Sequence, residues 1–300
     1  MNHEQKARTE RFHQLHNGPA PLMLPNAWDV ASARIIESAG AQAVATTSAG
    51  MAWALGYQDG EQMPVEDLLT ICRRICHAVS APVTVDIERG FGRSAEDTRE
   101  LVSALLQLGV SGINIEDGTD PDTRALADPA ILRERIAGAR VAAQHHNLPL
   151  FINARIDTYC TSDVLPAAKL EETHRRALAY IDAGADGIFV PGLVKPEEIA
   201  YLVQRLPVPL NIYAGYSGAP NAAELLRLGV RRISLGCGTM QATLAHLAKI
   251  ASEALVEGRY DTMADHMLTV SEANGLFSLT GPRHDQPLQH TARMAGAAAT

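Results

Sequence analysis

Short apolar runs alternate along the chain with longer stretches in which apolar residues recur every three or four positions. Eight short runs have the length of β-strands, and they lie at residues 22–25, 43–45, 83–86, 113–115, 150–156, 188–190, 210–213 and 233–235. The stretch from Glu66 to Val79 is typical of the segments between them, because its apolar residues form one helical face at Leu68, Leu69, Cys72, Ile75, Cys76 and Val79. Strands that alternate with helices predict a parallel sheet. Eight such units favour an α/β fold of the closed (β/α)8 TIM barrel type over an open doubly wound sheet.

Glycine and proline mark the ends of the predicted helices. Helix starts are indicated by Ser94 with Asp97, a capping-box pair, and by Pro129 and Pro196. No Gly-x-Gly-x-x-Gly motif follows the first strand, which disfavours a dinucleotide-binding fold. A helical stretch that ends in glycine before an apolar run recurs at Gly40, Gly109, Gly184 and Gly229.

The length suits one barrel followed by an extension. The chain has 300 residues, of which 46% are hydrophobic and 20% charged, so a large core is expected and disorder is excluded. We expect a barrel domain at 1–257 and a C-terminal helical extension at 258–300, with one helical stretch from Tyr260 to Asn274. The extension packs on the outside of the barrel or on a partner subunit in this interpretation, and a frayed tail is the alternative.

Charge and composition exclude several classes of partner. The net charge is −8 with scattered basic residues, so nucleic acid is not expected to bind. No apolar run reaches the roughly 18 residues of a membrane span, and the polar N-terminus lacks the apolar core of a signal peptide, so we expect a cytoplasmic protein. Histidines such as His13, His16, His145 and His146 fall on predicted helices and are interpreted as surface residues. The cysteines, Cys72, Cys76, Cys160 and Cys237, show no disulfide or metal-binding spacing.

Acidic residues gather where a barrel has its active site, at the C-terminal ends of the strands. Asp86 and Glu88 are two residues apart, so both point to one side of the third strand, and Glu116 ends the neighbouring strand. Asp59 lies in the loop region after the second strand. Such carboxylates repel one another unless a cation holds them, and an all-oxygen set suits Mg²⁺. The alternative is that they are solvated loop acids.

The fifth strand adds a polar pair at the same end. Asn153 and Arg155 share one side of this strand. An arginine beside a metal suits a substrate with a carboxylate. Alternatively, Arg155 serves only to neutralise Glu116.

Taken together, these motifs resemble the isocitrate lyase/phosphoenolpyruvate mutase superfamily. The similarity covers roughly residues 20–250 and rests on Leu24-Pro25-Asn26-Ala27-Trp28-Asp29, Thr46-Thr47-Ser48-Ala49-Gly50, Asp86-x-Glu88-x-Gly90-Phe91-Gly92, Ile115-Glu116-Asp117, Asn153-Ala154-Arg155 and Gly184-Ala185-Asp186-Gly187. The resemblance implies a (β/α)8 barrel, in a homodimer or homotetramer whose last helix is often swapped between subunits. It also implies Mg²⁺-dependent (or Mn²⁺-dependent) making or breaking of C–C or P–C bonds beside a 2-oxo acid, through a pyruvate-like enolate.

The same resemblance assigns roles to individual residues. Asp86 would contact Mg²⁺ directly or through water, and Asp59, Glu88 and Glu116 would hold its waters. Arg155, with Glu116 the predicted catalytic pair, would bind the enolate oxygen or a carboxylate. The substrate-binding residues would be Thr47, Ser48, Ala49, Asn153, Arg155 and Asn211.

The proton-transfer group stays open. Family lyases carry a Lys-Cys-Gly-His loop after the fourth strand, whereas Asp117–Arg124 contains neither lysine nor cysteine. Two other functions also remain: a Schiff-base aldolase, for which Lys195 is the nearest lysine to a strand end, and a non-catalytic barrel that binds a small dicarboxylate. The candidate replacements for the loop cysteine are Cys160, Tyr57, Tyr213 and Tyr216.

Overall fold

The strands form a parallel barrel, as predicted. The computed structural model describes residues 3–118, 125–265 and 267–278. One nine-stranded parallel sheet has the order β1-β9-β8-β7-β6-β5-β4-β3-β2. Its strands are β1 (Leu22–Leu24), β2 (Asn26–Ala27), β3 (Val44–Thr46), β4 (Val83–Asp86), β5 (Gly112–Glu116), β6 (Phe151–Arg155), β7 (Gly187–Val190), β8 (Leu210–Tyr213) and β9 (Arg232–Ser234).

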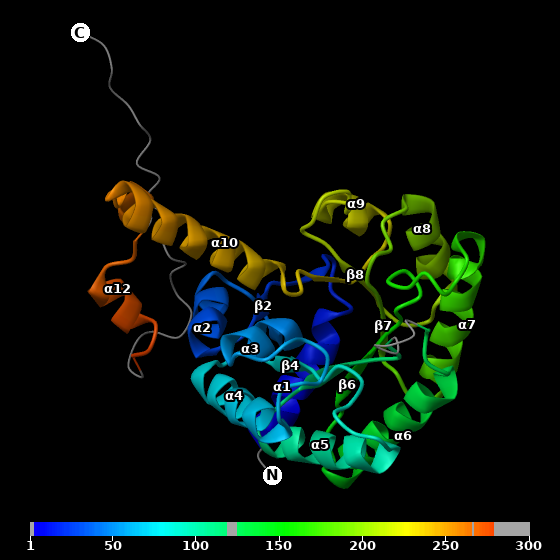
Figure 1. The fold of residues 1–300 in the computed structure, drawn as a ribbon. Helices are drawn as coiled ribbons and strands as arrows, with labels where there is room; N and C mark the ends of the chain where they lie inside the picture. Colours follow the sequence, from blue (N-terminus) through cyan, green and yellow to red (C-terminus); the bar gives the residue numbers. More distant parts are fainter. Residues whose placement is uncertain (1–2, 119–124, 266, 279–300) are drawn as a thin grey trace.

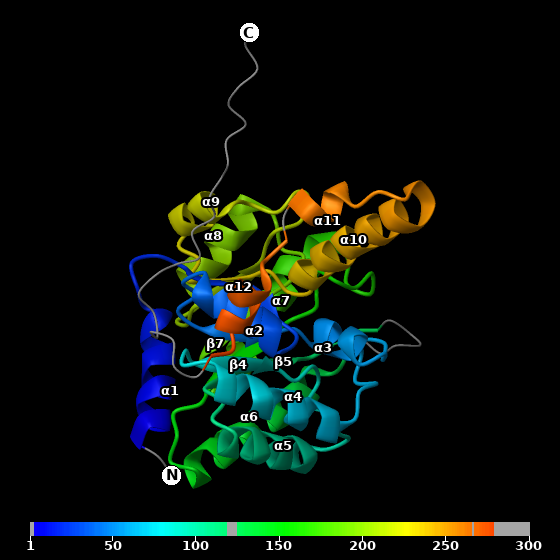
Figure 2. The ribbon, with the colours of Figure 1, turned by 90° about the vertical axis from the view of Figure 1, so that its left-hand side faces the viewer.

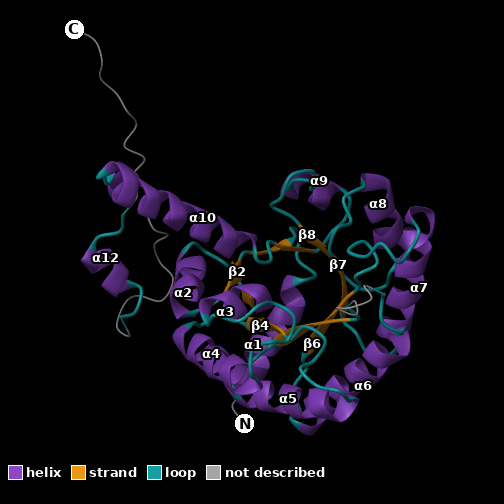
Figure 3. Ribbon diagram, in the orientation of Figure 1, coloured by secondary structure: helices purple, strands orange, loops and turns teal. Residues whose placement is uncertain are grey.

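The ninth strand arises because the first predicted strand is divided at Pro25. Its first half, β1, pairs with β9, and its second half, β2, pairs with β3. Proline lacks the N–H that a strand interior must donate, so a break at this position is expected. The two ends of the sheet are thus consecutive pieces of chain, and the sheet closes into a barrel surrounded by helices (Figures 1 and 3).

The predicted helix boundaries are largely confirmed. Ser94 and Asp97 form a capping box, and Pro129 and Pro196 open α6 and α8. The four junction glycines all have φ between +88° and +112°. The helices that follow the strands are α2 (Val30–Ser38), α3 (Ser48–Ala54), α4 (Val65–Ala78), α5 (Ala95–Gln107), α6 (Pro129–His145), α7 (Lys169–Asp182), α8 (Pro196–Arg205), α9 (Ala222–Arg227) and α10 (Gly238–Ser252), with a 3-10 turn at Pro166–Ala168 before α7 and a π turn at Glu253–Glu257 after α10.

The N-terminal helix α1 (His3–Leu15) covers one end of the barrel, a position that was not predicted from the sequence. Figure 2 shows α1 on the side of the molecule opposite α3. Its Phe12 is fully buried and packs edge-on against Phe151 with ring centroids 5.5 Å apart. A Cβ at Gly112 would lie only 2.6 Å from the Phe12 ring, so glycine makes room for this ring. The helix therefore closes the N-terminal end, and the C-terminal end remains for a site.

The interpretation of His16 as a surface residue is wrong. The side chain is 1% exposed and stacks on Phe151 with centroids 3.9 Å apart. Burial and the charge of Arg232 lower the pKa of His16 to about 3, so the ring is neutral. The burial of His16 follows from the position of α1 under the barrel, which the local sequence pattern does not indicate.

The C-terminal part differs from the single helix expected between Tyr260 and Asn274. Two short helices form there, α11 (Asp261–Asp265) and α12 (Val270–Gly275). Thr269 and Glu272 make a capping box that starts α12 as a separate helix. In Figure 1, α10 projects from the barrel and α12 lies below its far end. Within the described ranges, no helix is long and apolar enough to cross a membrane.

Candidate active site

The loop after β3 fixes Asp86 at the mouth of the barrel. Ser48 Oγ donates to Asp86 Oδ2 at 3.0 Å, and the Asp86 backbone N–H donates to Thr46 Oγ1 at 3.0 Å. Thr47 is the N-cap of α3 and accepts from the Gly50 N–H at 3.4 Å. The predicted residues Thr47, Ser48 and Ala49 are therefore brought beside the predicted metal ligand Asp86, and all three are buried.

Glu88 lies in an unusual backbone turn after β4. Its φ is +48°, in a region that costs a non-glycine residue about 1 kcal/mol or more and that is typical of functional sites. Its carboxylate accepts from the Glu61 N–H at 2.7 Å, and Glu61 in turn accepts from the Phe91 N–H at 2.7 Å. Glu61 and Phe91 also have positive φ values, 60° and 52°. The segments before α4 and after β4 are thus fastened together, with Glu88 between them.

Arg155 joins two carboxylates on neighbouring segments. Its Nη1 lies 2.8 Å from Glu116 Oε2, and its Nε donates to Asp157 Oδ1 at 2.7 Å. The side chain of Arg155 is 27% exposed and that of Glu116 is 14% exposed, so the pair faces the mouth. The contact that the sequence analysis weighed as an alternative role for Arg155, neutralisation of Glu116, is therefore present.

A buried network supports this pair from behind. Asp117 Oδ1 accepts from the Asp157 N–H at 3.0 Å. Asp117 Oδ2 accepts from Arg176 Nη1 and from the Tyr180 hydroxyl, each at 2.9 Å. Arg176 and Asp117 are both almost fully buried, so α7 anchors the backbone that orients Arg155.

The carboxyl groups at the mouth outnumber the positive charge beside them, which is that of Arg155. Burial raises the pKa of Asp86, although Arg155 and Ser48 partly offset it. Burial and the charges of Asp86 and Asp59 raise the pKa of Glu88 to about 8. Burial also raises the pKa of Glu116 well above its usual range, despite Arg155. These raised values are typical of carboxylates arranged to receive a cation.

The donor set fits a cation that keeps its own waters. Across the described parts of the chain, no three acidic, histidine or cysteine residues converge closely enough to hold an ion by themselves. Asp59 is exposed, whereas Asp86 and Glu116 lie at neighbouring strand ends. Oxygen donors of this kind, few in number and spread around the mouth, suit Mg²⁺, which usually binds one or two carboxylates and retains water.

The two predicted asparagines lie inside the barrel. Asn153 Nδ2 donates to Asn114 Oδ1 at 2.9 Å, and Asn211 Nδ2 donates to Ser234 Oγ at 3.1 Å. Asn153 is 1% exposed and Asn211 is fully buried. Asn153 is two residues before Arg155 on β6, so it lies one pleat repeat below the mouth.

Two residues of the site, Asp157 and Glu61, were not predicted from the sequence. Asp157 follows Arg155 by two residues, as Glu88 follows Asp86, and this repeated spacing was the available signal. Glu61 has no comparable signal, because its role depends on a turn conformation that the sequence does not indicate.

The candidate proton-transfer groups differ in burial and in their hydrogen-bond partners. Cys160 Sγ lies 3.6 Å from the Pro191 carbonyl oxygen, and the residue is exposed to solvent. Tyr57 donates to Asp67 at 3.2 Å, whereas the Tyr216 hydroxyl is buried without a hydrogen-bond partner. Burial and a hydrogen bond to Cys237 raise the pKa of Tyr213 to about 12. Most of the loop that replaces the family's Lys-Cys-Gly-His segment, residues 119–124, lies outside the described residues.

Lys195 does not resemble a Schiff-base lysine. Its side chain is 61% exposed and pairs with Glu198 at 2.9 Å on α8. A lysine that forms a Schiff base normally needs a desolvated environment to lower its pKa.

Comparison with known proteins identifies the family. The model of the phosphoenolpyruvate phosphomutase family matches residues 12–255 of the 300. The chain belongs to this family. A 2-methylisocitrate lyase from Salmonella typhimurium is 30% identical over 208 residues, which cover 64% of this chain and 65% of that protein.

Two solved structures from Burkholderia cenocepacia J2315 support the assignment. One, named "putative lyase/mutase", has a TM-score of 0.85 and 30% identity, and covers 94% of this chain and 98% of its own. The other, named "putative phosphonomutase", has a TM-score of 0.78 and 38% identity, and covers 83% of this chain and 99% of its own. This member of the phosphoenolpyruvate phosphomutase family is accordingly an enzyme of the lyase and mutase type with a (β/α)8 barrel fold.

Proposed function

We propose that this family member is a Mg²⁺-dependent lyase or mutase that breaks or rearranges a C–C or P–C bond beside a 2-oxo acid, through a pyruvate-like enolate. The observation that carries the proposal is the arrangement of Asp86, Glu88 and Glu116 around Arg155 at the barrel mouth, with raised pKa values for all three acids. Excess carboxylate next to a single guanidinium suits a site that takes up a divalent cation together with an anionic substrate.

The acidic residues would hold the metal. Asp86, oriented by Ser48 and Thr46, would bind Mg²⁺, and Asp59, Glu88 and Glu116 would hold its waters. Mn²⁺ would substitute, since it prefers similar oxygen donors. Bound there, the ion would supply positive charge that stabilises the developing enolate oxygen.

The remaining residues would bind and orient the substrate. Arg155 Nη1 would donate to the enolate oxygen or to a carboxylate, while Asp157 holds the other edge of the guanidinium. Thr47, Ser48 and Ala49 would receive the substrate carboxylate through hydroxyl and backbone N–H groups. Asn153 and Asn211 would line the floor of the site.

Calorimetry with oxalate tests this function, because oxalate mimics the planar pyruvate enolate. We expect micromolar binding that requires Mg²⁺ and that disappears in Asp86→Ala. Asp163→Ala is a suitable control, since Asp163 is an exposed acid after β6 that accepts from the Leu126 N–H. Oxalate binding that is absent, or that is independent of Mg²⁺, would overturn the proposal.

A second candidate is a barrel that binds a small dicarboxylate without turnover. It is favoured by the contacts of Arg155, which already pairs with both Glu116 and Asp157. This alternative predicts Mg²⁺ and dicarboxylate binding together with no product from any 2-oxo or phosphono acid tested.

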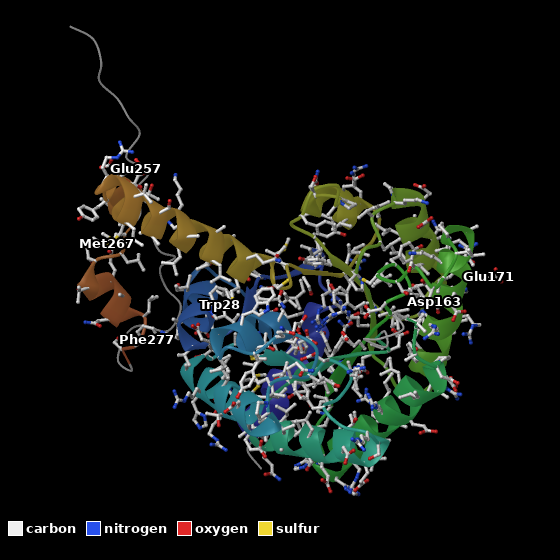
Figure 4. All side chains as sticks on the ribbon, viewed as in Figure 1. Trp28, Asp163, Glu171, Glu257, Met267 and Phe277 are labelled. Atoms are coloured by element: carbon white, nitrogen blue, oxygen red, sulfur yellow. The ribbon has the colours of Figure 1, made fainter. Side chains whose placement is uncertain are left out.

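We further propose that the enzyme is a homodimer or homotetramer in which α10 packs on a partner subunit. Every residue of α10 is described, and only Met240 is buried. Leu244 and Leu247 are 43% and 58% exposed, and the side chains of Met267 and Phe277 in the segment that follows are also largely exposed (Figure 4). An apolar surface of this kind is typical of a subunit interface.

A further inference from the structure

A buried cation crosses the interior of the barrel below the mouth. Arg232 lies on β9 and is fully buried. Its Nη2 donates to Asn114 Oδ1 on β5 at 2.9 Å. Because β1 and β2 together fill one place in the barrel, β9 and β5 are four places apart in either direction around it. The guanidinium therefore reaches across the barrel axis from one wall to the opposite wall.

The guanidinium lies directly below the candidate active site. Asn114, its partner, is paired in register with Asp86 on β4 and precedes Glu116 by two residues on β5. Asn114 and Glu116 point to the same side of the strand, and two residues span about 7 Å. The Arg232 guanidinium is thus about one pleat repeat below Glu116 and at the strand level of Asp86.

Nothing described near Arg232 neutralises it. Across the described ranges, no acidic side chain is within ion-pair distance of Arg232. The ring of Phe12 lies beneath it, 5.9 Å from Cζ, and the nearby His16 is neutral. Burial lowers the pKa of Arg232 to about 9 and the charge of Asp86 opposes this, so the guanidinium remains charged at neutral pH.

Several buried polar atoms at and near Arg232 have no hydrogen-bond partner among the described residues. Arg232 Nε and Nη1 are buried donors without a partner, and Asn153 Oδ1 is a buried acceptor without one. A mixture of donors and acceptors is typical of an internal water site. Such a site contains no negative charge, so the field of the guanidinium extends to the mouth.

We infer that Arg232 is an electrostatic positioning residue, whose buried charge strengthens the binding of the anionic substrate and weakens the binding of Mg²⁺ alone. This inference rests on the proposed function of the same site. A positive charge below the mouth attracts a 2-oxo acid dianion or its enolate and repels a divalent cation. Loss of this charge should therefore weaken substrate binding and strengthen Mg²⁺ binding. Loss of a residue with a purely structural role would weaken the binding of both ligands.

Matched substitutions separate charge from structure. Arg232→Gln removes the charge, Arg232→Lys retains it, and Asn114→Asp neutralises it in place by putting a carboxylate against the guanidinium. Arg231→Gln is the control, because Arg231 immediately precedes β9 and its guanidinium donates to the Gly18 carbonyl oxygen at 3.1 Å, away from Asn114. Calorimetry measures the Kd of Mg²⁺ alone and the Kd of oxalate at saturating free Mg²⁺, and circular dichroism checks the fold.

We take an effective dielectric constant near 20 to 40. Arg232→Gln and Asn114→Asp should then raise the Kd of oxalate on the order of tenfold and lower the Kd of Mg²⁺ by roughly several-fold. Arg232→Lys should stay within about threefold of wild type for both ligands, and Arg231→Gln should be unchanged. If Arg232→Gln does not fold, Asn114→Asp still distinguishes an electrostatic role from a structural one, because it keeps the guanidinium in place.

The outcomes distinguish this inference from the proposed function. If wild-type enzyme shows no Mg²⁺-dependent oxalate binding, the proposed function itself fails. Suppose instead that wild type binds both ligands, but Arg232→Gln or Asn114→Asp leaves both Kd values unchanged or raises both. Arg232 then has no electrostatic role, and the inference is overturned.

Discussion

Arg155 Nη1 lies 2.8 Å from Glu116 Oε2, and these two residues stand side by side in the register of β6 and β5. The residue expected to bind an anionic substrate is thereby bonded to a residue expected to hold the waters of Mg²⁺. A bound cation would attract the carboxylate of Glu116 and so weaken its ion pair with Arg155. The guanidinium of Arg155 would then be available to donate hydrogen bonds to the substrate. The ion pair thus couples the two halves of the site.

The first prediction concerns the structural role of that pair. Arg155→Met leaves the carboxylates of Glu116 and Asp157 without their cation, and we expect the free energy of unfolding to fall by about 3 kcal/mol at pH 7. The loss should shrink at acidic pH, because protonated carboxyl groups no longer need a cation. Urea unfolding at both pH values measures it.

Arg133→Met is the control for this experiment. Arg133 and Asp182 form a solvent-exposed pair at 3.9 Å, and such pairs contribute at most about 1 kcal/mol. Equal losses for both variants would show that the pair at the mouth is no more stabilising than a surface ion pair.

The second prediction concerns Glu88 and pH. An unfolded glutamate releases its proton near pH 4.5, whereas the folded enzyme retains it up to a pKa of about 8. Between these values Glu88 makes the folded chain bind more protons, whereas the buried neutral His16 makes it bind fewer below pH 6.5. Above pH 6.5 only the Glu88 contribution of these two still changes, so the stability of the metal-free enzyme falls as pH rises from about 6.5 to 8. Glu88→Gln should flatten this part of the Tm profile.

Saturating Mg²⁺ should also raise Tm most at the alkaline end of this range, since it compensates the charge that appears there. Glu100→Gln, at an exposed acid on α5, should leave the profile unchanged. A wild-type Tm that rises between pH 6.5 and 8 without metal would contradict the prediction.

The third prediction concerns the floor of the barrel. Phe12 is fully buried among Leu22, Leu24, Ala45 and Phe151, so Phe12→Ala leaves a cavity and should cost about 3–5 kcal/mol of stability. Phe277→Ala, at a side chain that is 50% exposed, should cost far less. Guanidinium chloride unfolding compares the two, and a loss below about 1 kcal/mol for Phe12→Ala would show that α1 does not form part of the core.

The fourth prediction concerns assembly. A double substitution of Leu244→Asp and Leu247→Asp places charges on the exposed apolar face of α10, which is expensive to bury in an interface. Light scattering after size exclusion should show a monomer for this variant and a dimer or tetramer for wild type. Leu165→Asp, at a leucine that is 73% exposed and lies on the β6–α7 connection, should leave the assembly intact. A monomeric wild type would refute the proposed interface.

Most of the barrel could be predicted because its signals are local. Gly109 and Gly184 end helices through their own backbone freedom, and Pro129 and Pro196 start helices through theirs, so each boundary depends on a few adjacent residues. The division of the first strand was missed, although Pro25 contained the signal. The burial of α1 could not be predicted, because its buried residues include Gln5 and Thr9, which have no apolar pattern, and because it depends on the end of the barrel that the helix covers.

Residues of the site could be predicted only where they come at the C-terminal ends of strands. Asp86, Glu88, Glu116 and Arg155 come at strand ends, and the barrel geometry brings such positions together. The pairing of Arg155 with Glu116 was one of the two roles that the sequence suggested for Arg155. The sequence could not indicate that Glu61 donates to Glu88 or that Arg232 crosses the barrel, because these contacts depend on side-chain and backbone directions in different segments.

The most direct test of the central claim is a crystal structure of the enzyme with Mn²⁺ and oxalate, with anomalous diffraction to locate the metal. The proposed function predicts one strong manganese peak at bonding distance from Asp86, oxalate bound to that metal, and an oxalate oxygen within hydrogen-bond distance of Arg155. Manganese or oxalate bound away from Asp86 and Arg155, with the barrel mouth filled only by water, would contradict an enolate-stabilising site.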